Sequence, residues 1–150
     1  MNSVTLQRVD ASNFIACFDL KLHSGQEKFV SHPVRSLAQA YVYYSQCTPF
    51  AVCRDGQVIG YLMVIYDYDE EVYCIWHLMI DKEYQGKGYG RAAMELALPY
   101  IRAKPFGDSN RVLLTVNPEN RTACGLYRAL GFSETGRSDG DEVELGLTLD

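Results

Sequence analysis

The chain has 150 residues, of which 47% are hydrophobic and 22% are charged, and its net charge is −5. This size and composition fit one globular domain with a sizeable core. An acidic chain argues against wholesale nucleic-acid binding. No run approaches the ~18 apolar residues of a membrane span, so we expect neither nucleic-acid nor membrane partners. Residues 1–10 alternate like a strand and lack the apolar stretch of a signal peptide, which favours a cytoplasmic location.

The cysteines are odd in number, scattered, and contain no Cys-x-x-Cys pair; they are Cys17, Cys47, Cys53, Cys74 and Cys124. This spacing indicates neither a zinc site nor a disulfide framework. We therefore expect buried thiols and no metal.

The first quarter of the chain predicts a strand and two helices. Residues 4–9 form the expected strand, and Ser12 or Asn13 is a candidate N-cap for a helix to about His23. A second helix is predicted from Ser36, because apolar residues then recur at i, i+3, i+4 and i+7. These expected core residues are Leu37, Ala40, Tyr41 and Tyr44.

The middle of the chain changes to a β pattern. Residues 50–54 and 57–66 are β-rich and flank Asp55-Gly56, a strong hairpin signal. Residues 67–71 form an acidic loop, and residues 72–80 are apolar enough for a buried strand.

The second half of the chain predicts a helix at 91–103, in which Pro99 can introduce a kink, and a strand at 111–116. The inner face of that helix is expected to hold Ala92, Ala93, Leu96, Ala97 and Tyr100. Asn120 can cap a further helix that ends at Gly131. Residues 132–136 and 142–149 then predict a final hairpin. This order indicates an α/β fold with one largely central sheet.

The stretch Gln85-Gly86-Lys87-Gly88-Tyr89-Gly90-Arg91 follows a predicted strand and opens a predicted helix. Glycines let the backbone approach a ligand closely, and free N–H groups at a helix start bind phosphate oxygens. A Walker A loop needs Ser or Thr after its lysine, and a dinucleotide fingerprint needs glycine at position 91. The residues alone leave two alternatives, a pyrophosphate-binding turn of another kind or a plain glycine-rich helix start.

Two motifs together favour the first alternative. Gln85, Gly88 and Gly90 fill the Q/R-x-x-G-x-G/A pattern that follows an apolar strand in GNAT acetyltransferases. A second pattern, N-x-x-N-x-x-A-x-x-L-Y-x-x-x-G-F, is filled by Asn117, Asn120, Ala123, Leu126, Tyr127, Gly131 and Phe132. The chain therefore resembles the GNAT superfamily over residues 50–148, and residues 1–49 fit it in outline. The run Asp81 to Gly88 is most similar to bacterial diamine and polyamine (spermine/spermidine) acetyltransferases.

The resemblance implies a GNAT fold, with a mixed, mostly antiparallel sheet flanked by helices, and acetyl-CoA as co-substrate. Backbone groups of Met79 and Ile80 would pair with the pantetheine arm, and an N–H near Leu78 or Met79 would stabilise the oxyanion. The pyrophosphate would be held by N–H groups of Gln85, Gly86, Lys87, Gly88, Tyr89, Gly90 and Arg91. Lys87 and Arg91 are also candidates to neutralise phosphate charge.

The C-terminal motif has its own implied roles. Asn120 would hydrogen-bond the pantetheine in addition to capping its helix, and Asn117 is either a turn residue or a ligand contact. Tyr127 would lie near the sulfur, where a tyrosine can protonate a departing thiolate. Its alternative is an ordinary residue of an amphipathic helix.

The base that deprotonates the amine is left open by the sequence. His77 lies just before the expected bulge, where many family members carry an acidic residue, and it is either the base or a buried, hydrogen-bonded histidine. Other candidates are ordered water and the carboxylates of the acidic loop. His23 and His32 have nothing to single them out.

The acceptor predicted from the resemblance and from charge is a small polyamine such as spermidine or spermine. The acidic loop places four carboxylates at a hairpin tip, namely Asp67, Asp69, Glu70 and Glu71. Several carboxylates together attract a polycation, but an acidic tip also simply aids solubility. Another amine (a peptide N-terminus, an amino acid or an aminoglycoside) and a non-catalytic CoA-binding module are the alternatives. Members of the superfamily often dimerise, so a homodimer is an open expectation.

Overall fold

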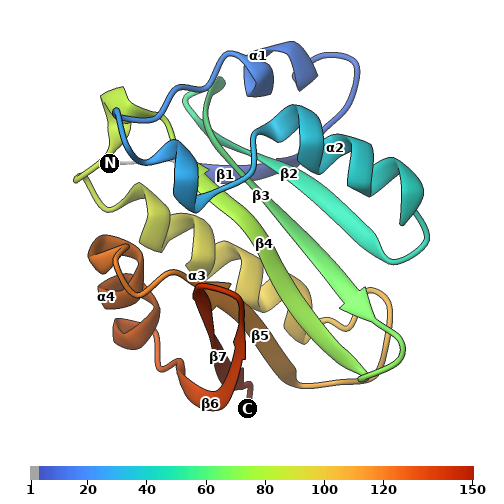
Figure 1. Ribbon diagram of the computed structural model, residues 1–150. Helices are drawn as coiled ribbons and strands as arrows, with labels where there is room; N and C mark the ends of the chain where they lie inside the picture. Colours follow the sequence, from blue (N-terminus) through green and yellow to red (C-terminus); the bar gives the residue numbers. More distant parts are fainter. Residues whose placement is uncertain (1–3) are drawn as a thin grey trace.

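The computed structural model describes residues 4–150, which include the whole expected strand 4–9 but not residues 1–3 of the alternating segment 1–10. Seven strands form one sheet in the order β1-β2-β3-β4-β5-β7-β6 (Figure 1). The strands are β1 (Val4–Arg8), β2 (Cys47–Arg54), β3 (Gln57–Asp67), β4 (Val72–Ile80), β5 (Arg111–Val116), β6 (Ser133–Asp139) and β7 (Glu142–Thr148). Neighbouring strands are antiparallel except β4 and β5, which run parallel.

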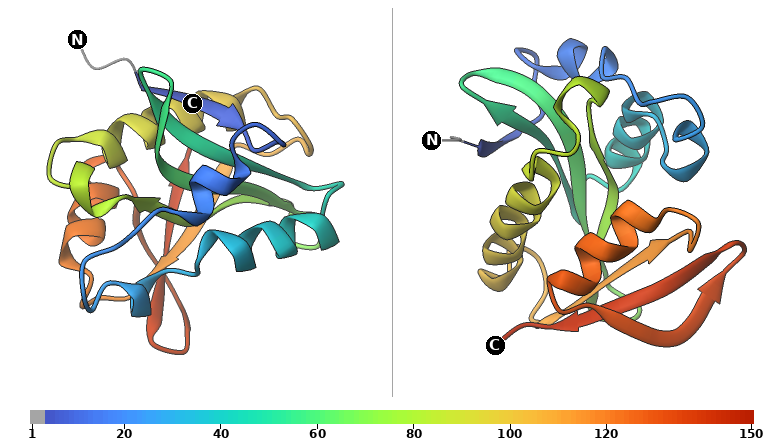
Figure 2. Two further views of the ribbon diagram at one scale, coloured as in Figure 1. Left: turned by 90° about the horizontal axis from the view of Figure 1, so that it is seen from above. Right: turned by 90° about the vertical axis from the view of Figure 1, so that its left-hand side faces the viewer.

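Helices cover both faces of this sheet. They are α1 (Phe14–Phe18), α2 (Pro33–Val42), α3 (Tyr89–Arg102) and α4 (Arg121–Ala129), with short 3-10 turns at Glu27–Phe29 and Lys82–Tyr84. In the right-hand view of Figure 2 the sheet runs between α3 on one side and α2 on the other. Each face has its own core, one packed under α3 and α4 and the other under α1 and α2. The predicted α/β fold with a mixed, mostly antiparallel sheet is therefore confirmed.

Local sequence signals account for several boundaries. Asp55 and Gly56 both have positive φ, 51° and 80°, as a two-residue type I′ turn requires. The side chain of Asn120 accepts a hydrogen bond from the N–H of Ala123 and caps α4. Gly131 follows α4 with φ 100°, as expected for a glycine at a helix end.

The N-terminal helices depart from the sequence-based expectation. The first helix covers only five residues, and the Asn13 side chain bonds the backbone of Arg8 and Asp10 instead of capping it. The second helix starts earlier than Ser36, with His32 as N-cap and Pro33 in its first turn. Proline suits that position because its missing N–H would have no helical partner there.

The predicted inner faces of two helices were also partly wrong. Tyr41 is 81% exposed, because α2 buries Pro33, Ser36 and Ala40 instead, and Tyr44, which is 78% exposed, lies beyond the end of α2 at Val42. A residue next to a buried one lies about 100° around the helix and so can face solvent. For the same reason Leu96, beside buried Ala97, is exposed on α3. The core of α3 is completed by Met94 and Ile101, which the sequence analysis did not select.

All five cysteines are free thiols, and four of them are buried; Cys74 is half-buried. Burial raises the pKa of Cys17 to about 11 and that of Cys74 to about 12. These thiols are therefore protonated near neutral pH and act as small core residues.

A bulge in β4 positions the site described next. Tyr61 of β3 pairs with Met79 and Met63 pairs with Trp76, so β4 holds one extra residue between these pairs. His77 lies in the bulge with φ 62°. Strands β4 and β5 pair only at Tyr73–Val112 and Cys74–Leu113. Among residues 4–150, no strand pairs with the edge of β4 beyond Cys74 on that side.

Candidate active site

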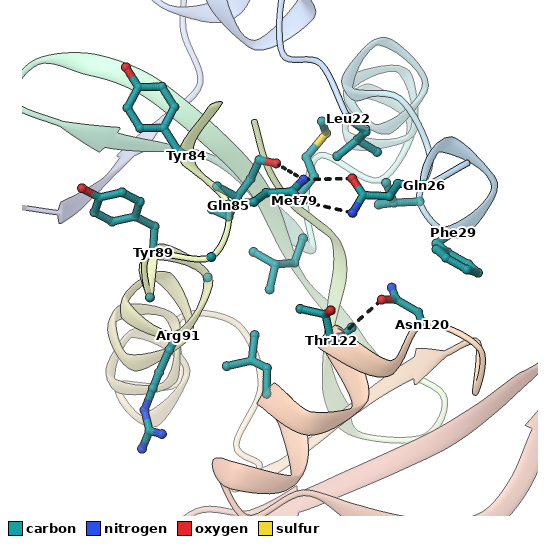
Figure 3. A pocket seen from close by; sticks show the side chains of 18 of the residues that line it. Leu22, Gln26, Phe29, Met79, Tyr84, Gln85, Tyr89, Arg91, Asn120 and Thr122 are labelled. Carbon is teal, nitrogen blue, oxygen red and sulfur yellow. Dashed lines mark hydrogen bonds between the residues drawn. The ribbon is translucent and has the colours of Figure 1, made fainter. Parts of the chain in front are cut away.

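A pocket of about 540 Å³ opens where β4 and β5 separate (Figure 3). The end of β4, the loop before α3, the first turns of α3 and α4, and the segment between α1 and α2 all contribute to it. The predicted site residues that line it are Leu78, Met79, Ile80, Gln85, Gly86, Gly88, Tyr89, Gly90, Arg91, Asn120 and Tyr127. Two segments that are separate in the sequence, residues 78–91 and residues 120–127, thus meet at one cavity.

The glycine-rich loop forms one wall of the pocket. Gly86 and Gly88 have φ 76° and 85°, and a Cβ built on either would meet no atom within 4 Å. Gly88 is the N-cap of α3, and no side chain caps that helix end. The first N–H groups of the 14-residue α3 are therefore free of a capping side chain, beside a pocket wall that has no side chain at Gly88. Such a helix start favours an anion.

Two residues predicted to contact the cofactor do not line the pocket, and a third points away from it. Lys87 donates from Nζ to the carbonyl of Glu83 at 3.3 Å. Asn117 accepts from the N–H of Glu119 at 2.9 Å, as its turn-residue alternative predicts. Arg91 lines the pocket, but its guanidinium pairs with Glu95 at 3.0 Å, along the outside of α3 (Figure 3).

One wall of the pocket was missed by the sequence analysis. It comes from the segment between α1 and α2 and consists of Leu22, Gln26, Phe29 and Val30. Gln26 and Gln85 exchange two amide hydrogen bonds of 3.0 and 3.1 Å, and Gln85 also donates to the carbonyl of Ile80. These bonds join the N-terminal segment to the glycine-rich loop. No local pattern marked Gln26, since its partner is 59 residues away.

Tyr127 faces the pocket from the side of α4 and is 8% exposed. Burial is the main cause that raises its pKa above the usual value, with smaller contributions from Cys124 and Glu142. The phenol therefore keeps its proton at neutral pH. Within residues 4–150 no protein group hydrogen-bonds this hydroxyl. A protonated phenol can donate its proton to a thiolate that leaves in the same buried surroundings, because burial disfavours the charged form of both groups.

His77 lies beside the pocket but not in its lining. Its Nδ1 is 2.7 Å from the hydroxyl of Ser36. Burial, followed by the positive charge of Arg35, lowers the pKa of His77 to about 4. At neutral pH the ring is therefore uncharged and a weak base. Its environment is closer to that of a buried, hydrogen-bonded histidine than to that of a catalytic base.

The acidic loop lies at the other end of β4 from the pocket. The eight residue-to-residue steps from Val72 to Ile80, at ~3.3 Å each in a regular strand, correspond to roughly 26 Å. None of the four predicted acceptor-binding carboxylates, those of Asp67, Asp69, Glu70 and Glu71, lines the pocket. The structure thus separates them from the donor side of the site.

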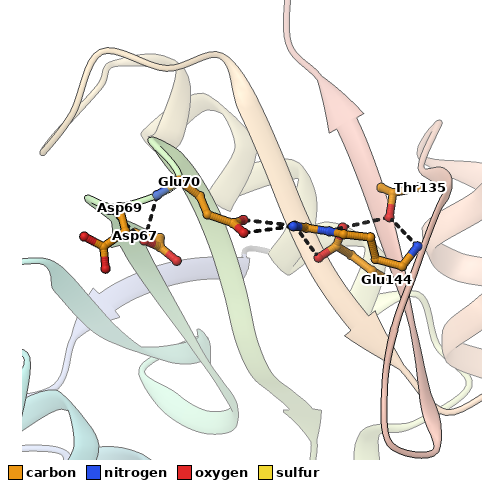
Figure 4. A network of polar contacts seen from close by, with 6 residues as sticks. Asp67, Asp69, Glu70, Thr135 and Glu144 are labelled. Atoms are coloured by element: carbon orange, nitrogen blue, oxygen red, sulfur yellow. Dashed lines mark hydrogen bonds and ion pairs between the residues drawn. The ribbon is translucent and has the colours of Figure 1, made fainter.

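Part of the acidic loop belongs to an ion-pair network (Figure 4). Arg137 on β6 binds Glu70 through two hydrogen bonds of 2.8 and 2.9 Å and also binds Glu144 on β7. The hydrogen bonds from Arg137 are the largest cause that lowers the pKa of Glu70. The carboxylate of Asp67 accepts the N–H groups of Asp69 and Glu70 and shapes the turn. Neither Arg137 nor Glu144 was selected by the sequence analysis.

Within residues 4–150 no group of three or more His, Cys, Asp or Glu side chains is placed to hold a metal ion. No helix in the same part of the chain is long and apolar enough to span a membrane.

Comparisons with known proteins agree with this geometry. The chain is 26% identical over 145 residues to the spermine/spermidine N(1)-acetyltransferase of Bacillus subtilis, covering 91% of this chain and 92% of that one. It is 35% identical over 66 residues to a peptidyl-lysine N-acetyltransferase of Escherichia coli, covering 44% and 40% of the two chains. The fold is similar to that of the Vibrio cholerae spermidine N-acetyltransferase solved with CoA and spermine. That comparison has a TM-score of 0.78 and 20% identity, and covers 97% and 95% of the chains. Residues 14–132 match the acetyltransferase (GNAT) family, so this chain belongs to that family and is an acetyl-CoA-dependent N-acetyltransferase.

Proposed function

We propose that this enzyme acetylates a small polyamine and that the pocket between β4 and β5 is its acetyl-CoA site. One observation supports the site above all others. The unpaired edge of β4, the glycine-lined start of α3 and the neutral phenol of Tyr127 line the same cavity. These are the three kinds of group that a phosphate-bearing thioester needs.

The residue roles follow from chemistry. Acetyl-CoA supplies an activated acyl group with a thiol leaving group. The N–H groups of the Gln85–Arg91 loop bind the pyrophosphate, and backbone groups of Met79 and Ile80 orient the pantetheine arm. Asn120 donates from its Nδ2 to the same arm, because capping occupies only its Oδ1.

During acyl transfer, negative charge grows on the carbonyl oxygen, and the N–H of Leu78 or Met79 stabilises it. Tyr127 then donates its proton to the leaving sulfur. Within residues 4–150 the lining of the pocket contains no Asp, Glu or His. We therefore assign removal of the amine proton to water.

The proposal of a polyamine acceptor rests on sequence similarity and on charge, and not on the lining of the pocket. Full-length similarity to a spermine/spermidine N(1)-acetyltransferase favours it, whereas the partial match to a peptidyl-lysine enzyme favours a protein amine. Asp67, Glu70 and Glu144 lie near Cys74 of β4, and Arg137 pairs with two of these three carboxylates. This end of the sheet keeps a net negative charge, which suits a cation.

An amine panel tests the proposal directly. Release of CoA from acetyl-CoA is measured with spermidine, spermine, lysine peptides, peptide N-termini, amino acids and aminoglycosides. We expect spermidine or spermine to give the highest kcat/KM. Faster turnover of a peptide would show that the acceptor is a peptide amine and not a polyamine, and the assignment as an acetyltransferase would stand. Binding of acetyl-CoA without turnover of any amine would favour a non-catalytic CoA-binding module.

A charge-neutralised variant tests the acidic loop separately. Replacing Asp67, Asp69, Glu70 and Glu71 with their amides should raise KM for the polyamine severalfold at low salt, because these charges are remote from the pocket and attract a polycation only at long range. Added salt should raise the wild-type KM in the same direction. As a control, Asp141→Asn removes an exposed carboxylate from the turn between β6 and β7, away from the pocket lining, and should leave KM unchanged. Equal KM values for wild type and the amide variant would show that the loop serves only solubility.

A further inference from the structure

A buried chain of three polar side chains lies beside the pocket and has no role in the function proposed above. The hydroxyls of Tyr61 and Ser36 are 2.7 Å apart, and the Ser36 hydroxyl is 2.7 Å from Nδ1 of His77. Tyr61 and Ser36 are fully buried. The chain links β3 to α2 and α2 to the bulge of β4.

Counting donors and acceptors fixes the direction of this chain. In residues 4–150 the hydroxyl of Tyr61 has no hydrogen-bond partner except Ser36, so its proton must go to Ser36 or stay unpaired. A buried donor without an acceptor is strongly disfavoured. The single proton of Ser36 is then available for Nδ1 of His77. In any other order one of the buried hydrogens has no acceptor.

The bulge gives this chain a second function. His77 has φ 62°, a conformation that residues other than glycine adopt rarely and only when their surroundings hold them there. Its one side-chain hydrogen bond within the described residues goes to Ser36. The same contact therefore restrains the bulge of β4 at His77.

We propose that Ser36 is a positioning residue that locks His77 as the neutral tautomer with its proton on Nε2 and anchors the bulge of β4. Locked in this way, His77 is a hydrogen-bond donor toward its open side and not the base that takes the proton of the amine. The proposal rests on the proposed function only for its kinetic consequences.

The tautomer is tested on the wild-type protein at pH 7. Long-range proton–nitrogen NMR of protein with nitrogen-15-labelled histidine distinguishes the two neutral tautomers from the imidazolium. The chain has three histidines, and the signals missing from His77→Asn assign the ring. His32 is an internal reference, because its Nδ1 accepts the N–H of Val34 at 3.1 Å. We expect His77 to carry its proton on Nε2. A proton on Nδ1, or a charged ring, would overturn the proposal whatever reaction the protein catalyses.

Two pairs of variants test the consequence for catalysis. Ser36→Ala should lower kcat by about tenfold, as the loss of one hydrogen bond does, with little change in KM for acetyl-CoA. Tyr61→Phe should lower it less, because Ser36 still donates to His77. His77→Asn tolerates positive φ and still accepts from Ser36, so it should retain about tenfold more activity than His77→Ala. Equal losses in the Asn and Ala variants would indicate a base and contradict the proposal.

Discussion

Replacing Tyr127 with phenylalanine is expected to lower kcat by about 10²–10⁴-fold, the usual contribution of a general acid. The affinity for acetyl-CoA should hardly change. The ring of Tyr127 packs against Phe132, with ring centroids 6.0 Å apart. The ring of the substituted phenylalanine should keep this contact, so only the hydroxyl is lost. An interaction made mainly in the transition state affects kcat and not substrate binding. The measurement is kcat under conditions where chemistry limits the rate, together with Kd for acetyl-CoA.

A second buried tyrosine provides the control. The hydroxyl of Tyr73 donates to the carbonyl of Gly107 and accepts the N–H groups of Phe106 and Gly107. It does not line the pocket. Tyr73→Phe should lower the free energy of unfolding by about 1–3 kcal/mol and leave kcat unchanged. An unaltered kcat in Tyr127→Phe would remove this residue from the mechanism.

Acetyl-CoA should raise the melting temperature of the wild-type protein, and Gly88→Val should abolish this shift. A ligand that binds only the folded state adds about 2.7 kcal/mol to the free energy of unfolding at 100 times its Kd. A valine at position 88 would project into the open space beside the first N–H groups of α3. It would thus occupy the volume that we assign to the pyrophosphate. The readout is the melting temperature with and without millimolar acetyl-CoA.

Backbone strain alone must be separated from this steric effect. Gly136 on β6 has φ 91°, close to the 85° of Gly88, and a Cβ there also meets no atom within 4 Å. It lies away from the pocket lining. Gly136→Val should therefore destabilise the protein by strain yet keep the acetyl-CoA shift. Loss of the shift in both variants, or its presence in Gly88→Val, would move the pyrophosphate away from this loop.

Signals carried by a few consecutive residues were sufficient for most of the fold. Strands 72–80 and 111–116 were predicted at their observed bounds, and the Asp55-Gly56 turn and the Asn120 cap have their expected geometry. Each depends on a local property, such as a positive φ or a side chain that reaches its own helix. The spacing of Gln85, Gly88 and Gly90 likewise indicated the glycine-rich loop that lines the pocket.

Which face of a helix is buried, and which distant groups meet, depended on the tertiary structure. Tyr41 was predicted to be in the core and is exposed, whereas the polar Ser36 is buried because Tyr61 and His77 satisfy its hydroxyl. The contact of Gln26 with Gln85 and the pairing of Arg137 with Glu70 join residues 59 and 67 positions apart. Such contacts have no local periodicity, so no window of the sequence shows them. The sequence by itself determined the strands, the turns and the glycine-rich loop. The tertiary structure decided which side chains share the pocket and left His77 uncharged, because only packing sets burial and hydrogen-bond partners.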